Sequence, residues 1–140
     1  MLSAEEIVKE NKLSEKNFNV TLIEGKNCLK RPFEHPINFN YFVEPKNISN
    51  HMINCDYAFT NGGSTMLELM CIGTAVHVCP QTKNEEKFSD YMLDQGAIIS
   101  NNPTHFEIPS IKHINETRRK AMAIIDTEGT RRIIKELQRL

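Results

Sequence analysis

A glycine pair followed by two hydroxyl residues is the stretch of this sequence best suited to bind an anion. Gly62 and Gly63 follow a short apolar run, Tyr57–Thr60, and precede a nearly charge-free run of helical length. Between a strand and a helix, glycines let the backbone approach a ligand closely, and the first N–H groups of the helix then face an anion. Ser64 and Thr65 add hydroxyl donors at the same place. The pattern predicts a phosphate-binding turn.

Glu68 is the only charged residue of the run that follows this turn, four residues after Ser64. Four residues are about one helical turn, or ~6 Å along the axis, which is roughly the distance from a diphosphate to a ribose. A carboxylate there can accept two ribose hydroxyls. The same spacing, Thr65-x-x-Glu68, also fits a capping box, in which Glu68 only satisfies an N–H group at the helix start. The spacing alone leaves both interpretations open.

The elements around the turn predict a strand–helix–strand unit. Gly73 ends the charge-free run at the position of a helix C′ glycine, and the apolar run 75–79 follows it. Two apolar strands joined through a helix imply a parallel sheet that is buried on both faces.

The rest of the chain continues this alternation. Apolar patterns predict strands at 19–24, 37–43 and 97–100, a polar loop at 82–86, and helices at 3–17, 47–54, 88–95, 111–125 and near 133–140. We expect a single α/β domain over residues 1–140, with a Rossmann-like, doubly wound parallel sheet of about five strands and helices on both faces. The strand at 19–24 should lie beside Tyr57–Thr60, in the order 2-1-3-4-5.

Composition excludes several function classes. The net charge of −1 predicts no general attraction to nucleic acid or to an anionic membrane. No apolar run reaches the ~18 residues of a membrane span, so a cytoplasmic location is expected. The sequence has no CxxC pair, no HxxxH pair and no GxGxxG element, and it therefore predicts no metal ion and no cofactor.

Two residue types inside apolar runs are expected to be structural. His77 alternates with valines and is predicted to be a packed, hydrogen-bonded histidine. Cys55, Cys71 and Cys79 are expected to be reduced core residues, and Cys28 a loop cysteine between two lysines. The basic groups 118–120 and 131–132 are expected to be solvated helix faces.

The stretch from Asp56 to Ser100 also resembles a known family. The matching residues are Asp56 with the strand after it, Asn61, Gly62, Gly63, Ser64, Thr65, Glu68, Gly73, the strand 75–81, the turn at Asn84, and Gly96-Ala97. They resemble the C-terminal, nucleotide-sugar-binding domain of GT-B glycosyltransferases of the MurG type. The likeness is closer to polysaccharide-biosynthesis proteins of the SpsG and PseG kind, the latter a UDP-sugar hydrolase, and extends over about residues 18–138.

This resemblance implies a UDP-sugar as the ligand. By analogy, Gly63, Ser64 and Thr65 contact phosphate and Glu68 binds the ribose. The loop that follows the next strand, with Gln81 and Asn84, lies near the sugar or the phosphates. Asn61 and Gly62 complete the predicted ligand-binding set. The implied function is donor binding for a glycosyltransferase or UDP-sugar hydrolase of surface polysaccharide or nonulosonate biosynthesis.

Three departures from the family shape this expectation. The chain carries Asn84-Glu85 where the family often has Asn-Gln. By the resemblance, we also expect it to start at the helix after the family's usual first strand and to lack the acceptor-binding N-terminal domain. The resemblance therefore supplies no catalytic residue, and the isolated chain is not expected to be active alone. The alternative is a non-catalytic nucleotide-sugar or protein-binding module, paired with a separate acceptor-domain chain or with a second copy.

Overall fold

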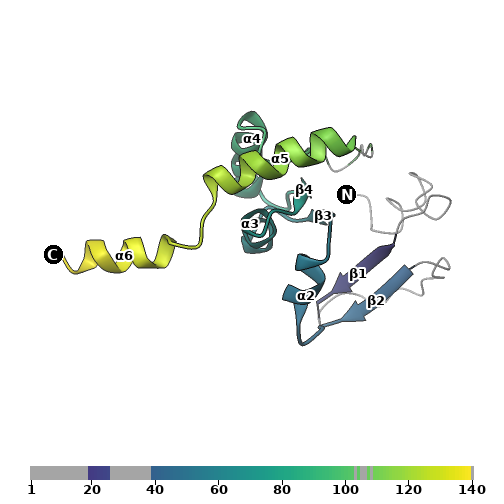
Figure 1. The fold of residues 1–140 in the computed structure, drawn as a ribbon, viewed down its shortest axis with the longest axis horizontal. Coiled ribbons are helices and arrows are strands. Elements are labelled where there is room, and N and C mark those ends of the chain that lie inside the picture. The colour runs from purple at the N-terminus through teal and green to yellow at the C-terminus, as the bar shows by residue number, and fades with distance from the viewer. Residues whose placement is uncertain (1–18, 26–38, 103, 105–106, 108, 140) are drawn as a thin grey trace. The chain divides into compact units, whose positions relative to one another are not determined.

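The computed structural model describes residues 19–25, 39–102, 104, 107 and 109–139 (Figure 1). The predicted helix at 3–17 and Cys28 with its loop lie outside the described residues. The chain divides into two compact units. Residues 1–51 and 103–107 form the first unit, and residues 52–102 and 108–140 form the second. Both contain parallel strands, so the mixed α/β class is confirmed.

The first unit contains a two-stranded parallel sheet. Strand β1 (Val20–Glu24) pairs with β2 (Phe39–Val43), and the register places Glu24 opposite Val43. The Tyr41 hydroxyl donates a 2.6 Å hydrogen bond to the carboxylate of Glu24, which ties the two strands together on their exposed side. Both strands were expected from their β-branched and aromatic residues.

Helix α2 (Ile48–Ile53) leads from the first unit into the second. The sequence predicts Ile48, Met52 and Ile53 to be inward. Only Met52 is buried, whereas Ile48 and Ile53 are 41% and 67% exposed, so the prediction was wrong for the two isoleucines. A six-residue helix has fewer than two turns and presents only a narrow stripe to a core.

The second unit contains the predicted strand–helix–strand element. Strand β3 (Tyr57–Thr60), helix α3 (Ser64–Cys71) and strand β4 (Ala75–Val78) follow one another, and β3 and β4 pair in parallel. Parallel strands need a crossover, and α3 provides it. The last residue of β3, Thr60, lies opposite Val78, the last residue of β4. The carboxyl ends of the two strands therefore lie side by side.

Two glycines in the left-handed region return the chain from helix to strand direction. Gly73 has φ +80, and the N–H groups of Gly73 and Thr74 bond to the carbonyls of Met70 and Leu69. These two hydrogen bonds at the helix end form a Schellman motif. The motif favours glycine, because a residue with a Cβ is strained at positive φ. Gly73 thus ends α3 as predicted.

The same device recurs after helix α4 (Lys83–Asp94). Gly96 has φ +65, and the chain from Ala97 then runs beside β4. The predicted fifth strand at 97–100 is reduced to a single parallel bridge between His77 and Ser100. The predicted polar loop at 82–86 is mostly the first turn of α4, because Thr82 caps the helix start.

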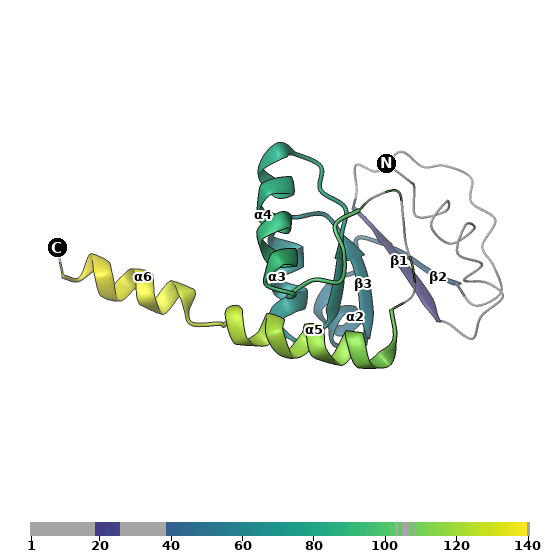
Figure 2. The ribbon, with the colours of Figure 1, turned by 90° about the horizontal axis from the view of Figure 1, so that it is seen from above.

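The core of the second unit is built mainly from α3, β4, α4 and the chain after Gly96. Its buried members are Met52, Met66, Leu69, Met70, Val76, Val78, Met92, Ala97, Ile98 and Ala121. Helix α5 (Ile111–Ile124) contacts β4, and it also contacts α3, beside which it runs in Figure 2. Arg118 on α5 was expected in solvent, but its Nε donates to the carbonyl oxygen of Gly73.

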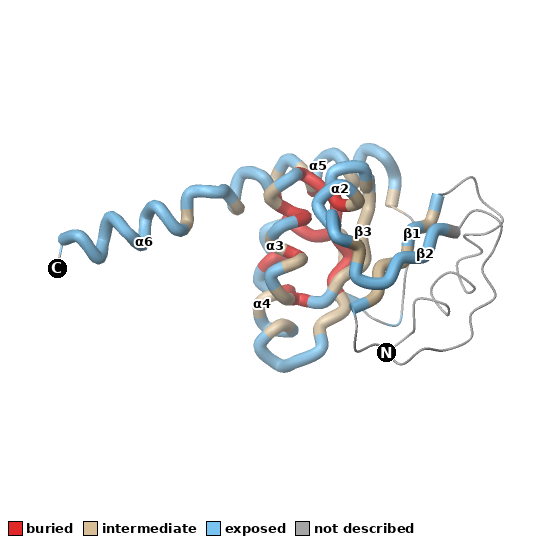
Figure 3. The backbone as a smooth tube through the Cα atoms, turned by 90° about the horizontal axis from the view of Figure 1, so that it is seen from below, coloured by how far each residue is buried: buried red, intermediate tan, exposed pale blue. Residues whose placement is uncertain are grey.

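Helix α6 (Gly129–Leu137) closes the described chain and has no buried residue (Figure 3). Its apolar side chains were expected to mark a packed face. Ile133, Ile134 and Leu137 are instead 64%, 50% and 64% exposed. Ile111, expected inward on α5, is 78% exposed. Helical periodicity identifies an apolar stripe but not whether another element covers it.

The described strands pair only within their own units, so a single doubly wound sheet of five strands is not confirmed. The pairing of β1 with β3 stays a prediction. Over the described part of the chain, every helix is too short or too polar to cross a bilayer.

Burial predicts a sharp contrast between α3 and α6. Met70 is fully buried, so Met70→Ala should lower the free energy of unfolding by about 2–5 kcal/mol, because it leaves a cavity. Ile134→Ala removes an exposed side chain and should change it by less than about 0.5 kcal/mol. Urea denaturation of the two variants measures both. A similar loss in both would mean that α6 is packed.

Candidate functional site

The turn between β3 and α3 leaves the start of the helix without a side-chain cap. Gly63 is the N-cap of α3, with extended backbone angles of φ −89 and ψ −158, and no side chain caps the helix. The first N–H groups of a helix have no carbonyl partner within it, and here they belong to Ser64 and Thr65. Ser64 is exposed and Thr65 half-buried. The capping-box interpretation of Thr65 was wrong, because the helix already begins at Ser64.

Glu68 lies on the exposed face of α3. Ser64, Glu68 and Cys71 share this face, because residues three and four apart in a helix lie above one another. Helical side chains lean toward the N-terminus, which points Glu68 toward Ser64. Glu68 also lines an open hollow of about 370 Å³ with Leu67, Cys71, Ile124, Ile125, Asp126 and Arg132. We call this space the Glu68 hollow.

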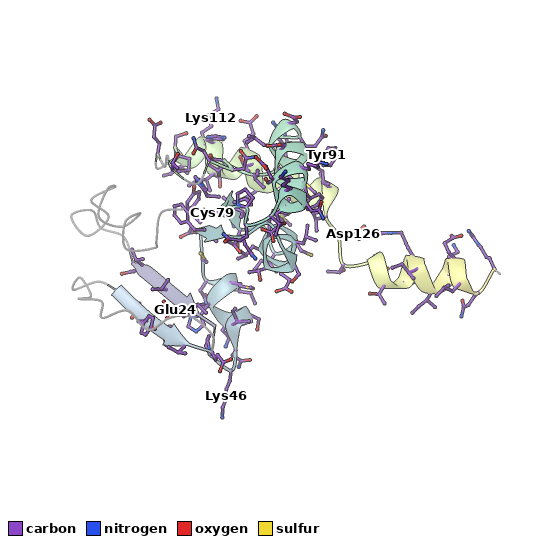
Figure 4. All side chains as sticks on the ribbon, turned by 180° about the vertical axis from the view of Figure 1, so that it is seen from behind. Glu24, Lys46, Cys79, Tyr91, Lys112 and Asp126 are labelled. Atoms are coloured by element: carbon purple, nitrogen blue, oxygen red, sulfur yellow. The ribbon has the colours of Figure 1, made fainter. Side chains whose placement is uncertain are left out.

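The Glu68 hollow is also lined by an ion pair between Asp126 and Arg132, which was not predicted from the sequence. Arg132 donates two hydrogen bonds, of 2.8 and 3.0 Å, to the carboxylate of Asp126. Asp126 also accepts from the N–H of Glu128, which holds the chain ahead of α6 (Figure 4 labels Asp126). These bonds, chiefly those from Arg132, hold the pKa of Asp126 below its ordinary value. A carboxylate six residues before an arginine is not a spacing that predicts an ion pair, so the sequence did not indicate this contact.

Glu85 is a third residue, after Asp126 and Arg132, that the predicted set of ligand-binding residues does not contain. One of its carboxylate oxygens, Oε2, accepts hydrogen bonds from the N–H of Gly62 at 3.1 Å and of Gln81 at 2.9 Å. Its own N–H donates to the Thr82 hydroxyl at 3.2 Å. Thr82-x-x-Glu85 has the spacing of a capping box, and that signal was available in the sequence.

The structure brings part of the predicted set together. Glu85 links Gly62 to the backbone of Gln81, whose side-chain amide donates to the Cys79 carbonyl oxygen. Asn61 is exposed and accepts a hydrogen bond from the Thr60 hydroxyl at 3.4 Å. Asn84 is exposed in the first turn of α4. The loop after β4 thus approaches the glycine turn through Glu85.

His77 lies in the middle of β4 and was correctly predicted to be packed and hydrogen-bonded. It is 2% exposed, and its Nε2 lies 2.8 Å from the carbonyl oxygen of Asn102. A carbonyl only accepts, so Nε2 carries the proton and the neutral ring accepts at Nδ1 from the Tyr57 hydroxyl, 3.3 Å away. Burial lowers the pKa of His77 and raises that of Tyr57.

The three described cysteines are free and half-buried. Burial raises the pKa of the thiols of Cys55 and Cys79, which makes both poor nucleophiles at neutral pH. No group of three or more His, Cys, Asp or Glu residues that could hold a metal ion occurs within the described ranges.

Comparison with protein-family models, with curated proteins and with solved structures gave no match. A functional proposal for this chain therefore depends on its residues and their geometry.

The two glycines of the turn should respond differently to an added Cβ. At Gly62 the new atom would lie 2.7 Å from Cβ and 3.2 Å from Cα of Glu85, so backbone must move. Gly62→Ala should lower the free energy of unfolding by about 1–3 kcal/mol, as overpacking does. At Gly63 the nearest atom is 3.5 Å away, and Gly63→Ala should cost less than about 1 kcal/mol. Equal losses in thermal denaturation would contradict this packing.

Stability should fall on mild acidification because His77 is buried in its neutral form. The unfolded state binds a proton below pH 6.5, its ordinary pKa, whereas the folded state resists protonation. The stabilisation from neutral His77 is therefore fully present above pH 6.5, and it is lost progressively as the pH falls below 6.5 toward the lowered pKa of the folded state. His77→Gln should flatten this part of the curve of unfolding free energy against pH. His113→Gln, which changes an exposed histidine, should leave the curve as it is.

Proposed function

We propose that this chain is a donor-binding domain that takes up a UDP-sugar, in a glycosyltransferase or UDP-sugar hydrolase of surface polysaccharide or nonulosonate biosynthesis. One observation carries the proposal. The N-terminus of α3, left without a side-chain cap, lies at the carboxyl ends of the parallel strands β3 and β4, and Glu68 follows on the same exposed face. Ligands of open parallel sheets bind at such ends.

Three neighbouring features support a UDP-sugar as the ligand. A phosphate accepts from the N–H groups and hydroxyls of Ser64 and Thr65 and is favoured by the positive end of the helix dipole. The ribose lies one turn further, where the carboxylate of Glu68 accepts its hydroxyls. The Glu68 hollow is open to solvent and leaves about 370 Å³ of free space beside that carboxylate.

A second candidate function is a module that binds a protein partner carrying the acceptor site. It is favoured by α6, whose exposed apolar side chains lie on one face of a helix without a buried residue. The three basic residues Arg131, Arg132 and Lys135 occupy the opposite face at helical spacing. The two functions are compatible, because a donor domain needs an acceptor domain. Only the first requires nucleotide binding by this chain.

UDP binding tests the first function. UDP should raise the melting temperature of the purified chain, because a ligand that binds only the native state stabilises it. Glu68→Ala should abolish the rise, and 2′-deoxy-UDP should give a smaller one, since an unpaired carboxylate discriminates against a missing hydroxyl. Gly63→Ala should also lose the rise, because a Cβ blocks close approach of the phosphate.

The matched control is Glu116→Ala, an exposed glutamate on α5 that should keep the full response. If UDP leaves the melting temperature unchanged at millimolar concentration, the nucleotide-binding function is wrong. If UDP stabilises Glu68→Ala as much as the parent chain, Glu68 does not contact the ribose.

A further inference from the structure

Glu85 fills a position that suits an anion. Its Oε2 accepts from two backbone N–H groups, those of Gly62 and Gln81, at 3.1 and 2.9 Å. The two donors follow neighbouring parallel strands, β3 and β4, whose ends lie side by side. A carboxylate oxygen and a phosphate oxygen are both charged acceptors, so two N–H groups that bind one can also bind the other.

The position of this carboxylate is set by its surroundings. Thr82 caps α4, and its hydroxyl accepts a hydrogen bond from the N–H of Glu85. This bond fixes the backbone of Glu85. Gly62 is buried, and the space where its Cβ would lie is taken by the Glu85 side chain, 2.7 Å away. The absence of a Cβ at Gly62 therefore makes room for the Glu85 side chain, which packs against the turn.

We propose that Glu85 is an internal anion that determines which ligands the turn accepts. An external phosphate reaches the N–H of Gly62 only when Glu85 is displaced or neutralised. An uncharged group with hydroxyls is accepted, because a carboxylate also accepts hydrogen bonds from hydroxyls. The assignment to a nucleotide-sugar rests on the proposed function: with ribose at Glu68 and phosphate at Ser64 and Thr65, the sugar lies toward Glu85. The site then prefers neutral sugars to nucleoside triphosphates.

Pyrophosphate tests the internal anion without any nucleotide. Amide signals of Gly62 and Gln81 in the ¹⁵N-labelled chain report its binding. In Glu85→Gln the side-chain amide oxygen can still accept the hydrogen bonds from Gly62 and Gln81, but the negative charge is removed. Pyrophosphate should therefore bind this variant about tenfold more tightly than the parent chain. Glu85→Ala should shift affinity in the same direction. Glu86→Gln, which removes an exposed charge next to it, should match the parent chain.

Equal affinity of Glu85→Gln and the parent chain, or an equal gain in Glu86→Gln, overturns the proposal. A gain confined to the Glu85 variants supports it, even if UDP binds to none of the chains, in which case only the nucleotide function fails. Where UDP does bind, the ratio of UTP to UDP affinity should rise about tenfold in Glu85→Gln. An unchanged ratio shows that Glu85 does not select the ligand, while the UDP-binding function stands.

Discussion

The parallel pairing of β3 with β4 is the constraint on which the candidate site depends. Because Thr60 lies opposite Val78, the chain leaves both strands at the same edge of the sheet. The glycine turn and the loop that begins after Cys79 are therefore neighbours, although about 20 residues separate them in sequence. Glu85 can bond to Gly62 and Gln81 at once only because of this pairing. An antiparallel pair would place the two loops at opposite ends.

Much of the second unit followed from local signals. Gly73 was a predicted helix end, and Gly96 directly follows the predicted helix at 88–95. Both adopt positive φ and begin a segment that runs parallel to its neighbour. Such signals are reliable because the physical cause, the strain of a Cβ at positive φ, acts within a few residues. The prediction for His77 succeeded for a similar reason: a polar ring among valines in a strand must find hydrogen-bond partners.

Long-range relations were harder to predict. Thr65-x-x-Glu68 and Thr82-x-x-Glu85 have the same capping-box spacing, yet only Thr82 is an N-cap. The difference is where the helix begins, and the glycines before Ser64 allow an earlier start. The contact of Glu85 with Gly62 spans 23 residues and depends on strand pairing. The apolar residues of α6 show the same limit, since periodicity does not specify what a face packs against.

Glu68 and Glu85 together constrain the charge pattern of the ligand that we propose. The Glu68 carboxylate lies on the exposed face of α3, and the Glu85 carboxylate accepts a hydrogen bond from Gly62 in the glycine turn. The helix start without a side-chain cap lies next to that turn. An anion fits only at the helix start, because each carboxylate repels a second one. The groups on the two sides of the diphosphate must then be neutral and offer hydroxyls. A nucleotide sugar has this order of ribose, diphosphate and sugar, whereas a nucleoside triphosphate brings its last phosphate toward Glu85.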